Sequence, residues 1–90
     1  MVKVYYFWAE WCGPCKIMSP IVDSLKLEYN VPDSKVEITK VNVDQHPEKA
    51  SLYGIRSIPT LVFERDGVTV NRTSGSKTKA AILNIINDLT

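Results

Sequence analysis

The sequence predicts an α/β protein: a mixed sheet of about four strands flanked by three helices, in the order βαβαββα. Residues 2–8 form a nearly continuous apolar and aromatic run, typical of a central strand covered on both faces. Two later stretches repeat apolar residues at helical spacing, and a turn sequence near residue 66 separates two short strand-like runs. The chain has 90 residues, 44% of them hydrophobic, so we expect one domain over residues 1–90.

The first half of the chain predicts a strand, a long helix and a second strand. Val2–Trp8 is the first strand, and the helix runs from Cys15 to Tyr29, interrupted by Pro20, which removes one backbone hydrogen bond and is expected to kink the axis. Asn30-Val31-Pro32-Asp33 ends this helix. Val36–Val43 is the second strand, in which Lys40 shares a face with apolar residues and is expected to point inward. The apolar positions of the helix are Met18, Ile21, Val22, Leu25 and Tyr29.

The second half predicts a short helix, a hairpin and a final helix. Residues 47–53 form the short helix, with Gly54 just past its end. Residues 60–64 and 68–72 flank Arg65-Asp66-Gly67, a turn that makes them an antiparallel hairpin. Ser76 is expected to cap the last helix, whose apolar stripe is a packing surface. The stripe consists of Ala81, Ile82, Ile85, Ile86 and Leu89.

The most informative motif is Trp11-Cys12-Gly13-Pro14-Cys15-Lys16, which contains both cysteines of the chain. Two thiols at this spacing can form a disulfide and reopen it by exchange with another protein. Gly13-Pro14 suits the entry to a helix, and a helix N-terminus favours a thiolate at Cys12. Lys16 adds a nearby positive charge. Cys12 is therefore the predicted nucleophile and Cys15, one turn deeper, the resolving thiol.

Other interpretations of the cysteine pair are weaker. A structural zinc site needs four ligands, but only His46 joins the two cysteines as a usual ligand, and it lies far along the chain in a polar connection. A structural disulfide across so short a loop would remove little entropy from the unfolded chain. Two unrelated buried thiols are a third possibility, which the flanking Trp, Gly and Pro disfavour. We therefore predict no metal and a redox role.

Composition restricts the partners. The formal net charge is +1, with 11 basic and 10 acidic residues, which offers no electrostatic attraction to nucleic acid or to an anionic membrane. We therefore expect protein partners and a monomer. The N-terminal stretch has no apolar run long enough for a signal peptide, so we expect a cytoplasmic protein whose dithiol is kept reduced.

The chain resembles the thioredoxin family over nearly its whole length. The matching segments are Phe7–Lys16, Pro20, Val41-Asn42-Val43-Asp44, Tyr53–Thr60 and Gly75 before the final helix. The resemblance implies a thioredoxin-like fold and reduction of protein disulfides by a redox-active disulfide, with no bound cofactor. It also implies recharging by a flavin-dependent thioredoxin reductase.

The same resemblance assigns roles around the cysteines. Ile58-Pro59 is expected to be the family's cis-proline segment, although a strand-start proline with a trans bond is the ordinary case. Asp44 is expected to bond to a tryptophan of the motif. The residues expected to line a shallow, mostly apolar recognition surface around Cys12 are Trp11, Gly13, Pro14, Ile58, Pro59 and Gly75.

Three departures from the family pattern are visible. The chain starts directly at the central strand, so the fold is expected to be a shortened one. Tyr6 stands where the family has a buried aspartate, with Lys40 at the position of its lysine partner. A phenol cannot act as a carboxylate base, so we hypothesise that Tyr6 and Lys40 hold a water near Cys15; ordinary packing of Tyr6 is the alternative. Ser74-Gly75-Ser76 predicts a more polar groove.

Two other functions remain open at this point. A glutaredoxin-like, oxidising or isomerase activity would show in the reduction potential. A non-catalytic binding subunit would use the surface around Trp11 and Ile58, and its binding would survive replacement of both cysteines.

Overall fold

The computed structural model describes residues 1–90 and has the predicted order of elements. The strands are β1 (Val2–Trp8), β2 (Val36–Asn42), β3 (Thr60–Arg65) and β4 (Val68–Ser74). The helices are α1 (Gly13–Tyr29), α2 (Pro47–Leu52) and α3 (Lys79–Leu89). All seven predicted elements are present; β1 has the predicted ends, and no end of another element differs from the predicted one by more than two residues.

The four strands form one mixed sheet in the order β2-β1-β3-β4. β1 pairs with β2 in parallel and with β3 antiparallel, so it is central, as its continuous apolar sequence predicts. β3 and β4 form the predicted antiparallel hairpin, with a register shift between Phe63 and Glu64. Asp66 and Gly67 both have positive φ at its turn, a conformation that aspartate tolerates and glycine favours.

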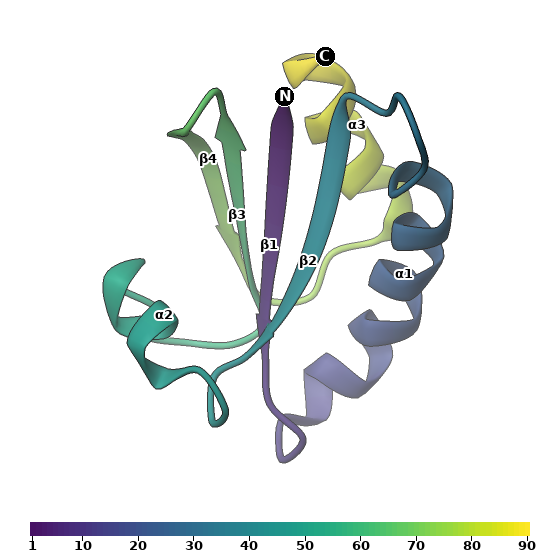
Figure 1. Ribbon diagram of the computed structural model, residues 1–90. Helices are drawn as coiled ribbons and strands as arrows, with labels where there is room; N and C mark the ends of the chain where they lie inside the picture. The colour runs from purple at the N-terminus through teal and green to yellow at the C-terminus, as the bar shows by residue number, and fades with distance from the viewer.

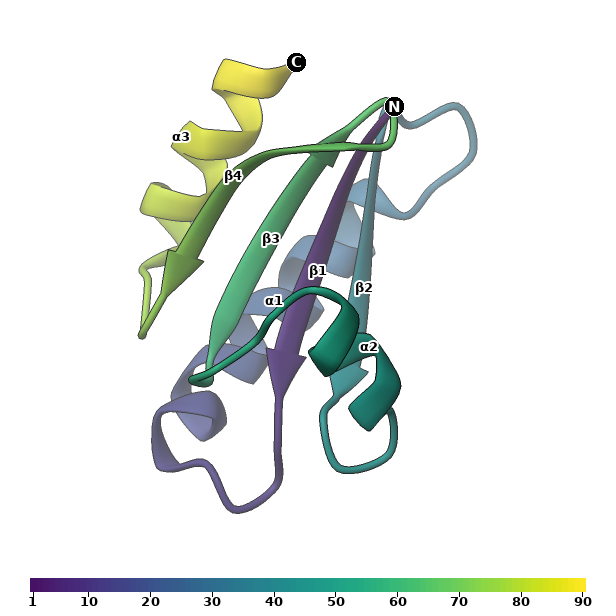
Figure 2. The same cartoon turned by 90° about the vertical axis from the view of Figure 1, so that its left-hand side faces the viewer.

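Helices cover both faces of the sheet, α1 and α3 one face and α2 the other (Figures 1 and 2). The face of α1 and α3 carries a cluster of twelve buried residues, contributed by β1, β2, β3, α1 and α3. The opposite face buries only Phe7, Val41 and Val62, with half-buried side chains around them. The redox motif follows the carboxyl end of β1, away from the two chain termini (Figure 1).

One sequence prediction about the helices is wrong. Thr78, and not Ser76, caps α3: its backbone is extended, and its side-chain oxygen accepts a hydrogen bond from the N–H of Ala81 at 3.1 Å. Gly75 has φ +85 and donates its N–H to the carbonyl of Pro59. This bond holds the connection between β4 and α3 next to the start of β3. The helix therefore begins only where the apolar stripe can reach the core, with Ile82 and Ile86 buried.

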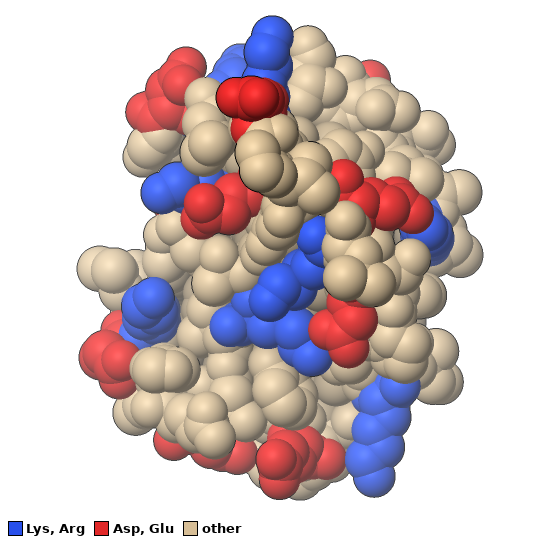
Figure 3. All heavy atoms as spheres, turned by 45° about the vertical axis from the view of Figure 1, so that its right-hand side comes forward, with Lys and Arg blue, Asp and Glu red and all other residues tan.

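Charged side chains are mixed on the surface. On the face drawn in Figure 3, basic groups are bordered by acidic ones, without a continuous field of one sign. None of the helices combines the length and the apolar character that a membrane crossing requires.

Candidate active site

The cysteine pair lies at the start of α1, as the motif predicts. Cys12 is the N-cap residue, with extended backbone, and its sulfur accepts a hydrogen bond from the N–H of Cys15 at 3.2 Å. The two cysteines form a disulfide with their Cα atoms 5.3 Å apart. Pro14 occupies the first turn, where its missing N–H leaves no bond unmade. No acidic residue lies in that turn, so no carboxylate of the helix itself opposes its positive end.

The disulfide sits at the surface but is largely covered. Cys12 is 4% exposed and Cys15 1%, and they form a small apolar cluster with Ala9. Trp8, Val43 and Ile58 pack against this cluster. Gly13, Pro14 and Lys16 are exposed around it, so the covering is thin on the side of the first turn.

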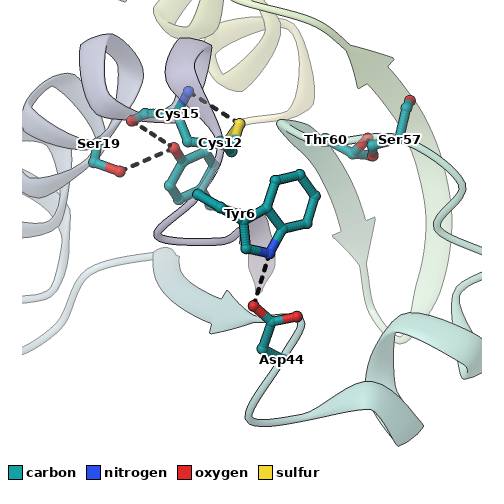
Figure 4. Close-up of a disulfide and its surroundings, with 8 residues drawn as sticks. Tyr6, Cys12, Cys15, Ser19, Asp44, Ser57 and Thr60 are labelled. Atoms are coloured by element: carbon teal, nitrogen blue, oxygen red, sulfur yellow. Dashed lines mark hydrogen bonds between the residues drawn. A yellow bond between two sulfur atoms is a disulfide. The ribbon is translucent and has the colours of Figure 1, made fainter.

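Trp11 projects from the loop before α1 and is 70% exposed. Its indole N–H donates to Asp44 Oδ2 at 2.8 Å, which confirms the predicted contact (Figure 4). Asp44 is held in turn because its N–H and that of Gln45 donate to the side-chain oxygen of Asn42. An exposed aromatic ring is thus fixed in orientation beside the disulfide, which lowers the entropy cost of using it for binding.

The Ile58-Pro59 peptide bond is cis, as the resemblance implied. Pro59 is buried, and its carbonyl accepts the N–H of Gly75 at 2.9 Å. The Thr60 hydroxyl donates to the carbonyl of Ser57 at 2.6 Å and closes the loop that precedes β3. The structure therefore joins Pro59 to Gly75 directly and brings Ile58 against the cysteine cluster.

A hollow of about 380 Å³ lies beside Trp11 and Ile58. Sequence reasoning did not select most of its lining, although three of those residues directly precede Ile58 in a segment that matches the family. The hollow is mostly apolar with one basic group. The residues that line it are Trp11, Val43, Ala50, Ile55, Arg56, Ser57 and Ile58.

Tyr6 and Lys40, the two other predicted residues, have separate partners. The Tyr6 hydroxyl donates to the carbonyl of Cys15 at 3.2 Å and lies 3.0 Å from Ser19 Oγ (Figure 4). Lys40 Nζ pairs with Asp23 Oδ1 at 3.0 Å and lies 4.9 Å from the centre of the Trp8 ring. The direct contacts of Tyr6 are therefore with α1. A water shared between Tyr6 and Lys40 stays a prediction. Sequence reasoning missed Ser19 and Asp23, because neither stands out in a helix.

Burial raises the pKa of Tyr6 above its ordinary value; the Ser19 hydroxyl lowers it, and the nearby Asp23 charge raises it further. The phenol therefore stays protonated at neutral pH, where it donates a hydrogen bond and does not act as a base. His46 lies apart from the site, 3.4 Å from Glu48. No cluster of three or more His, Cys, Asp or Glu side chains that could hold a metal ion occurs in the structure.

A disulfide between two closely spaced cysteines at the N-terminus of a helix, beside a cis-proline loop on an α/β sheet, is the arrangement of a thiol-disulfide oxidoreductase. Residues 2–88 match the family model described as Thioredoxin. The chain is 48% identical over 81 residues to a thioredoxin of Chlamydia caviae, covering 90% of this chain and 76% of that protein. It is 43% identical to thioredoxin 1 of Synechococcus elongatus, covering 90% and 73%.

Solved structures agree with the sequence relatives. The Fasciola hepatica thioredoxin superposes with a TM-score of 0.86 at 37% identity, covering 99% of this chain and 81% of that one. A mutant thioredoxin from Halobacterium salinarum superposes with a TM-score of 0.84 at 34% identity, covering 99% and 74%. The chain belongs to the thioredoxin family and has its fold and its thiol-disulfide oxidoreductase activity.

Proposed function

We propose that Cys12 is the attacking thiol and Cys15 the resolving thiol of a protein-disulfide reductase. The observation that carries this assignment is the position of Cys12 at the N-cap of α1, where its sulfur accepts the N–H of Cys15. After reduction, the same N–H and the helix N-terminus would favour a thiolate at Cys12. Cys15 lies inside the first turn and is the more buried of the two.

The reaction then has two exchange steps. The Cys12 thiolate attacks one sulfur of a substrate disulfide, which forms a mixed disulfide and releases the other substrate sulfur as a thiolate. Cys15 loses its proton to solvent and attacks the Cys12 sulfur, so that the second substrate thiolate leaves. The protein dithiol is oxidised to the Cys12–Cys15 disulfide, and the substrate disulfide gains the two electrons.

The substrates are disulfide-containing proteins, bound as extended segments on the surface formed by Trp11, Gly13, Pro14, Ile58, Pro59 and Gly75. Support comes from the fixed orientation of Trp11 and from the contact of Ile58 with the cysteine cluster. The apolar hollow beside these two residues could take a substrate side chain. The exposed Lys16, next to Cys15, would contribute positive charge beside the cysteines.

Recharging is proposed to come from a flavin-dependent thioredoxin reductase, with the protein acting as a cytoplasmic monomer and no cofactor bound. A dithiol reductant works only where a reducing partner keeps supplying electrons, which favours a reducing compartment. Family membership supports this source of electrons.

The testing experiment combines the reduction potential with two variants. We expect a potential close to about −270 mV, the thioredoxin end of the known range. Cys12→Ser should abolish reduction of a protein disulfide, whereas Cys15→Ser should accumulate a mixed disulfide visible by mass spectrometry. A potential near about −120 mV would instead indicate an oxidant. Partner binding that persists after both cysteines are replaced, without any turnover, would indicate a binding subunit.

A further inference from the structure

Tyr6 places a hydroxyl group directly behind the turn that carries Cys15. It comes from β1, which is hydrogen-bonded on both sides, and none of its surface is exposed. Its ring packs within the large core cluster, while its hydroxyl reaches Cys15 and Ser19 of α1 (Figure 4). The central strand of the sheet is thereby tied to the first turns of the redox helix.

The direction of these hydrogen bonds follows from proton counting. A phenol has a single proton, and Tyr6 donates it to the carbonyl oxygen of Cys15. The Ser19 hydroxyl must then be the donor of the second bond, at 3.0 Å, to the Tyr6 oxygen. The result is a chain of two bonds running from Ser19 through Tyr6 to the backbone of Cys15.

We propose that Tyr6 and Ser19 are positioning residues that hold Cys15 in place for the resolving step. This inference rests on the proposed roles of the two cysteines. In the oxidised protein the disulfide itself fixes Cys15 against Cys12. In the mixed disulfide that covalent link is open, and the contacts from β1 take over the task of holding the turn. A displacement of the attacking atom by a fraction of an ångström slows such a step.

The proposal separates the two exchange steps. Tyr6 bonds to the carbonyl of Cys15 and to Ser19, whereas the only side-chain hydrogen bond to Cys12 comes from the N–H of Cys15. Attack by Cys12 should therefore be insensitive to the hydroxyl pair. Cys15 and Ser19 also line an open hollow of about 400 Å³, through which the proton of the Cys15 thiol can leave to solvent.

The test uses the reduced protein and one equivalent of Ellman's reagent, an aromatic disulfide whose released thiolate absorbs visible light, followed by stopped flow. The first thiolate reports attack by Cys12, at a rate proportional to reagent concentration. The second reports attack by Cys15 on the Cys12 sulfur, at a rate independent of concentration. Tyr6→Phe and Ser19→Ala should each slow the second phase by about threefold to tenfold and leave the first unchanged.

Two further variants control for helix and side-chain effects. Ser19→Thr keeps the hydroxyl, and its second phase should be as fast as that of the original chain. Because threonine is no better a helix former than serine, such a rate would come from the hydroxyl and not from a more stable helix. Ser24→Ala removes a serine of the same helix that contacts Lys79 and not Tyr6, and should leave both phases as in the original chain. Because Ser19→Ala leaves Tyr6 in place, a folding defect of Tyr6→Phe would not remove the test.

The pH profile distinguishes positioning from proton transfer. The charged groups near the Tyr6 and Ser19 hydroxyls are Glu10, Lys16 and Asp23, which line the hollow shared with Cys15 and Ser19, and Lys40, which pairs with Asp23. All four are retained in the variants, and burial keeps Tyr6 protonated, so Tyr6→Phe should slow the second phase by the same factor from about pH 6 to 9. A changed profile shape would instead assign Tyr6 to proton transfer.

Other results overturn the proposal in different ways. Equal slowing of both phases by the variants would indicate a general structural defect, and an unchanged second phase would show that the hydroxyl pair has no role in it. If the original chain released no second thiolate, the assignment of Cys15 as resolving thiol would fail first, and this outcome is distinguishable from the other two.

Discussion

The two faces of the sheet are held by different forces. The face under α1 and α3 buries twelve side chains, among them Tyr6, Phe63 and Ile86, and its stability comes from apolar burial. The face under α2 buries three, and α2 itself has no buried residue. That helix is held instead by polar bonds at its C-terminal end. Arg72 donates to the carbonyls of Tyr53 and Gly54 at 2.6 and 2.8 Å, and Tyr53 donates to Glu64 at 2.7 Å.

The redox site lies where the two faces meet. Its cysteines start α1 and form a small cluster of their own, which Trp8, Val43 and Ile58 cover. The hollow beside Trp11 and Ile58 includes Ala50 of α2 and the loop that follows it. The reacting atoms thus start the helix whose later turns are anchored in the large core, and the surface expected to meet different partners borders the layer with fewer apolar contacts. Regions with few buried contacts open at lower free energy, which suits a surface that adapts to partners.

The largest expected effect is in the core under α1 and α3. Phe63→Ala removes a fully buried ring and should reduce the free energy of unfolding by about 3–5 kcal/mol, measured by urea denaturation. Its neighbour Val62 is equally buried but faces α2. Val62→Ala should cost about 1–2 kcal/mol, because fewer methylene groups are lost and the small cluster can relax. Phe63→Leu serves as the graded variant if Phe63→Ala does not fold. Equal costs for Val62→Ala and Phe63→Ala would contradict the comparison.

The next effect concerns the end of α1. The side chain of Asn30 pairs with both the N–H and the carbonyl of Ile38, each at 2.8 Å, and so takes the place of a neighbouring strand at the edge of β2. Asn30→Ala should cost about 1–2 kcal/mol for the two hydrogen bonds and expose an edge that can pair with another chain. Asn30→Asp, which keeps only the acceptor, is the matched control.

Urea denaturation and sedimentation velocity check this prediction. Asn30→Ala should associate at high protein concentration while the original chain does not. If Asn30→Ala has the stability and the association state of the original chain, the edge of β2 does not need the Asn30 side chain as a partner for Ile38.

A smaller effect is expected for the polar anchor of α2. Arg72→Lys keeps the charge but cannot form the two-pronged contact with two carbonyls, and it should cost about 1 kcal/mol because the group is exposed. Amide hydrogen exchange should rise in α2 and in the loop to Ile58, and stay unchanged in α1. Arg65→Lys, at the far end of the hairpin, is the control. Faster exchange across all the helices would mean that Arg72 supports the whole fold.

Features that depend on neighbouring residues could be predicted from the sequence, and features that depend on contacts between distant parts of the chain could not. The seven elements and the cysteine site follow from local periodicity and from a six-residue motif, and Pro59 from a resemblance that covers its surroundings. The cap at Thr78 was misassigned to Ser76 because two hydroxyl residues close together offer the same local signal. Which of them caps the helix depends on where Gly75 is tied to Pro59, a contact between distant parts of the chain.

The missed residues share this dependence on distant contacts. Ser19 acts through one side-chain bond to Tyr6, 13 positions away, and Arg72 through two bonds to the end of α2, 18 and 19 positions away. Such bonds have no periodicity and no preferred residue type, so nothing in the local sequence distinguishes them from ordinary surface or core positions. The substitution at Tyr6 was visible in the sequence, but its partner was not.

The smallest effect at neutral pH concerns Tyr53, on the α2 face, and it grows in alkali. Its ring packs 5.4 Å from that of Tyr5 and 5.6 Å from that of Phe7, and burial, followed by the bond to Glu64, raises its pKa far above the ordinary value. The stability linked to a raised pKa is fully present below the unfolded value of about pH 10 and is lost as the pH rises toward the folded value. Tyr53→Phe should therefore weaken the fold slightly at pH 7 and make its stability fall less steeply above about pH 10.

Urea midpoints measured between about pH 8 and pH 11 test this expectation. Glu64→Gln keeps the ring and removes the carboxylate; because burial is the larger cause, this variant should retain most of the alkaline loss. Tyr6, on the other face, also has a pKa raised mainly by burial, so the double variant Tyr6→Phe and Tyr53→Phe should flatten the profile further. If Tyr53→Phe and the original chain lose stability in parallel above pH 10, the ring on the α2 face is no more protected from solvent than in the unfolded chain. The contrast between the faces would then rest on the number of buried side chains alone.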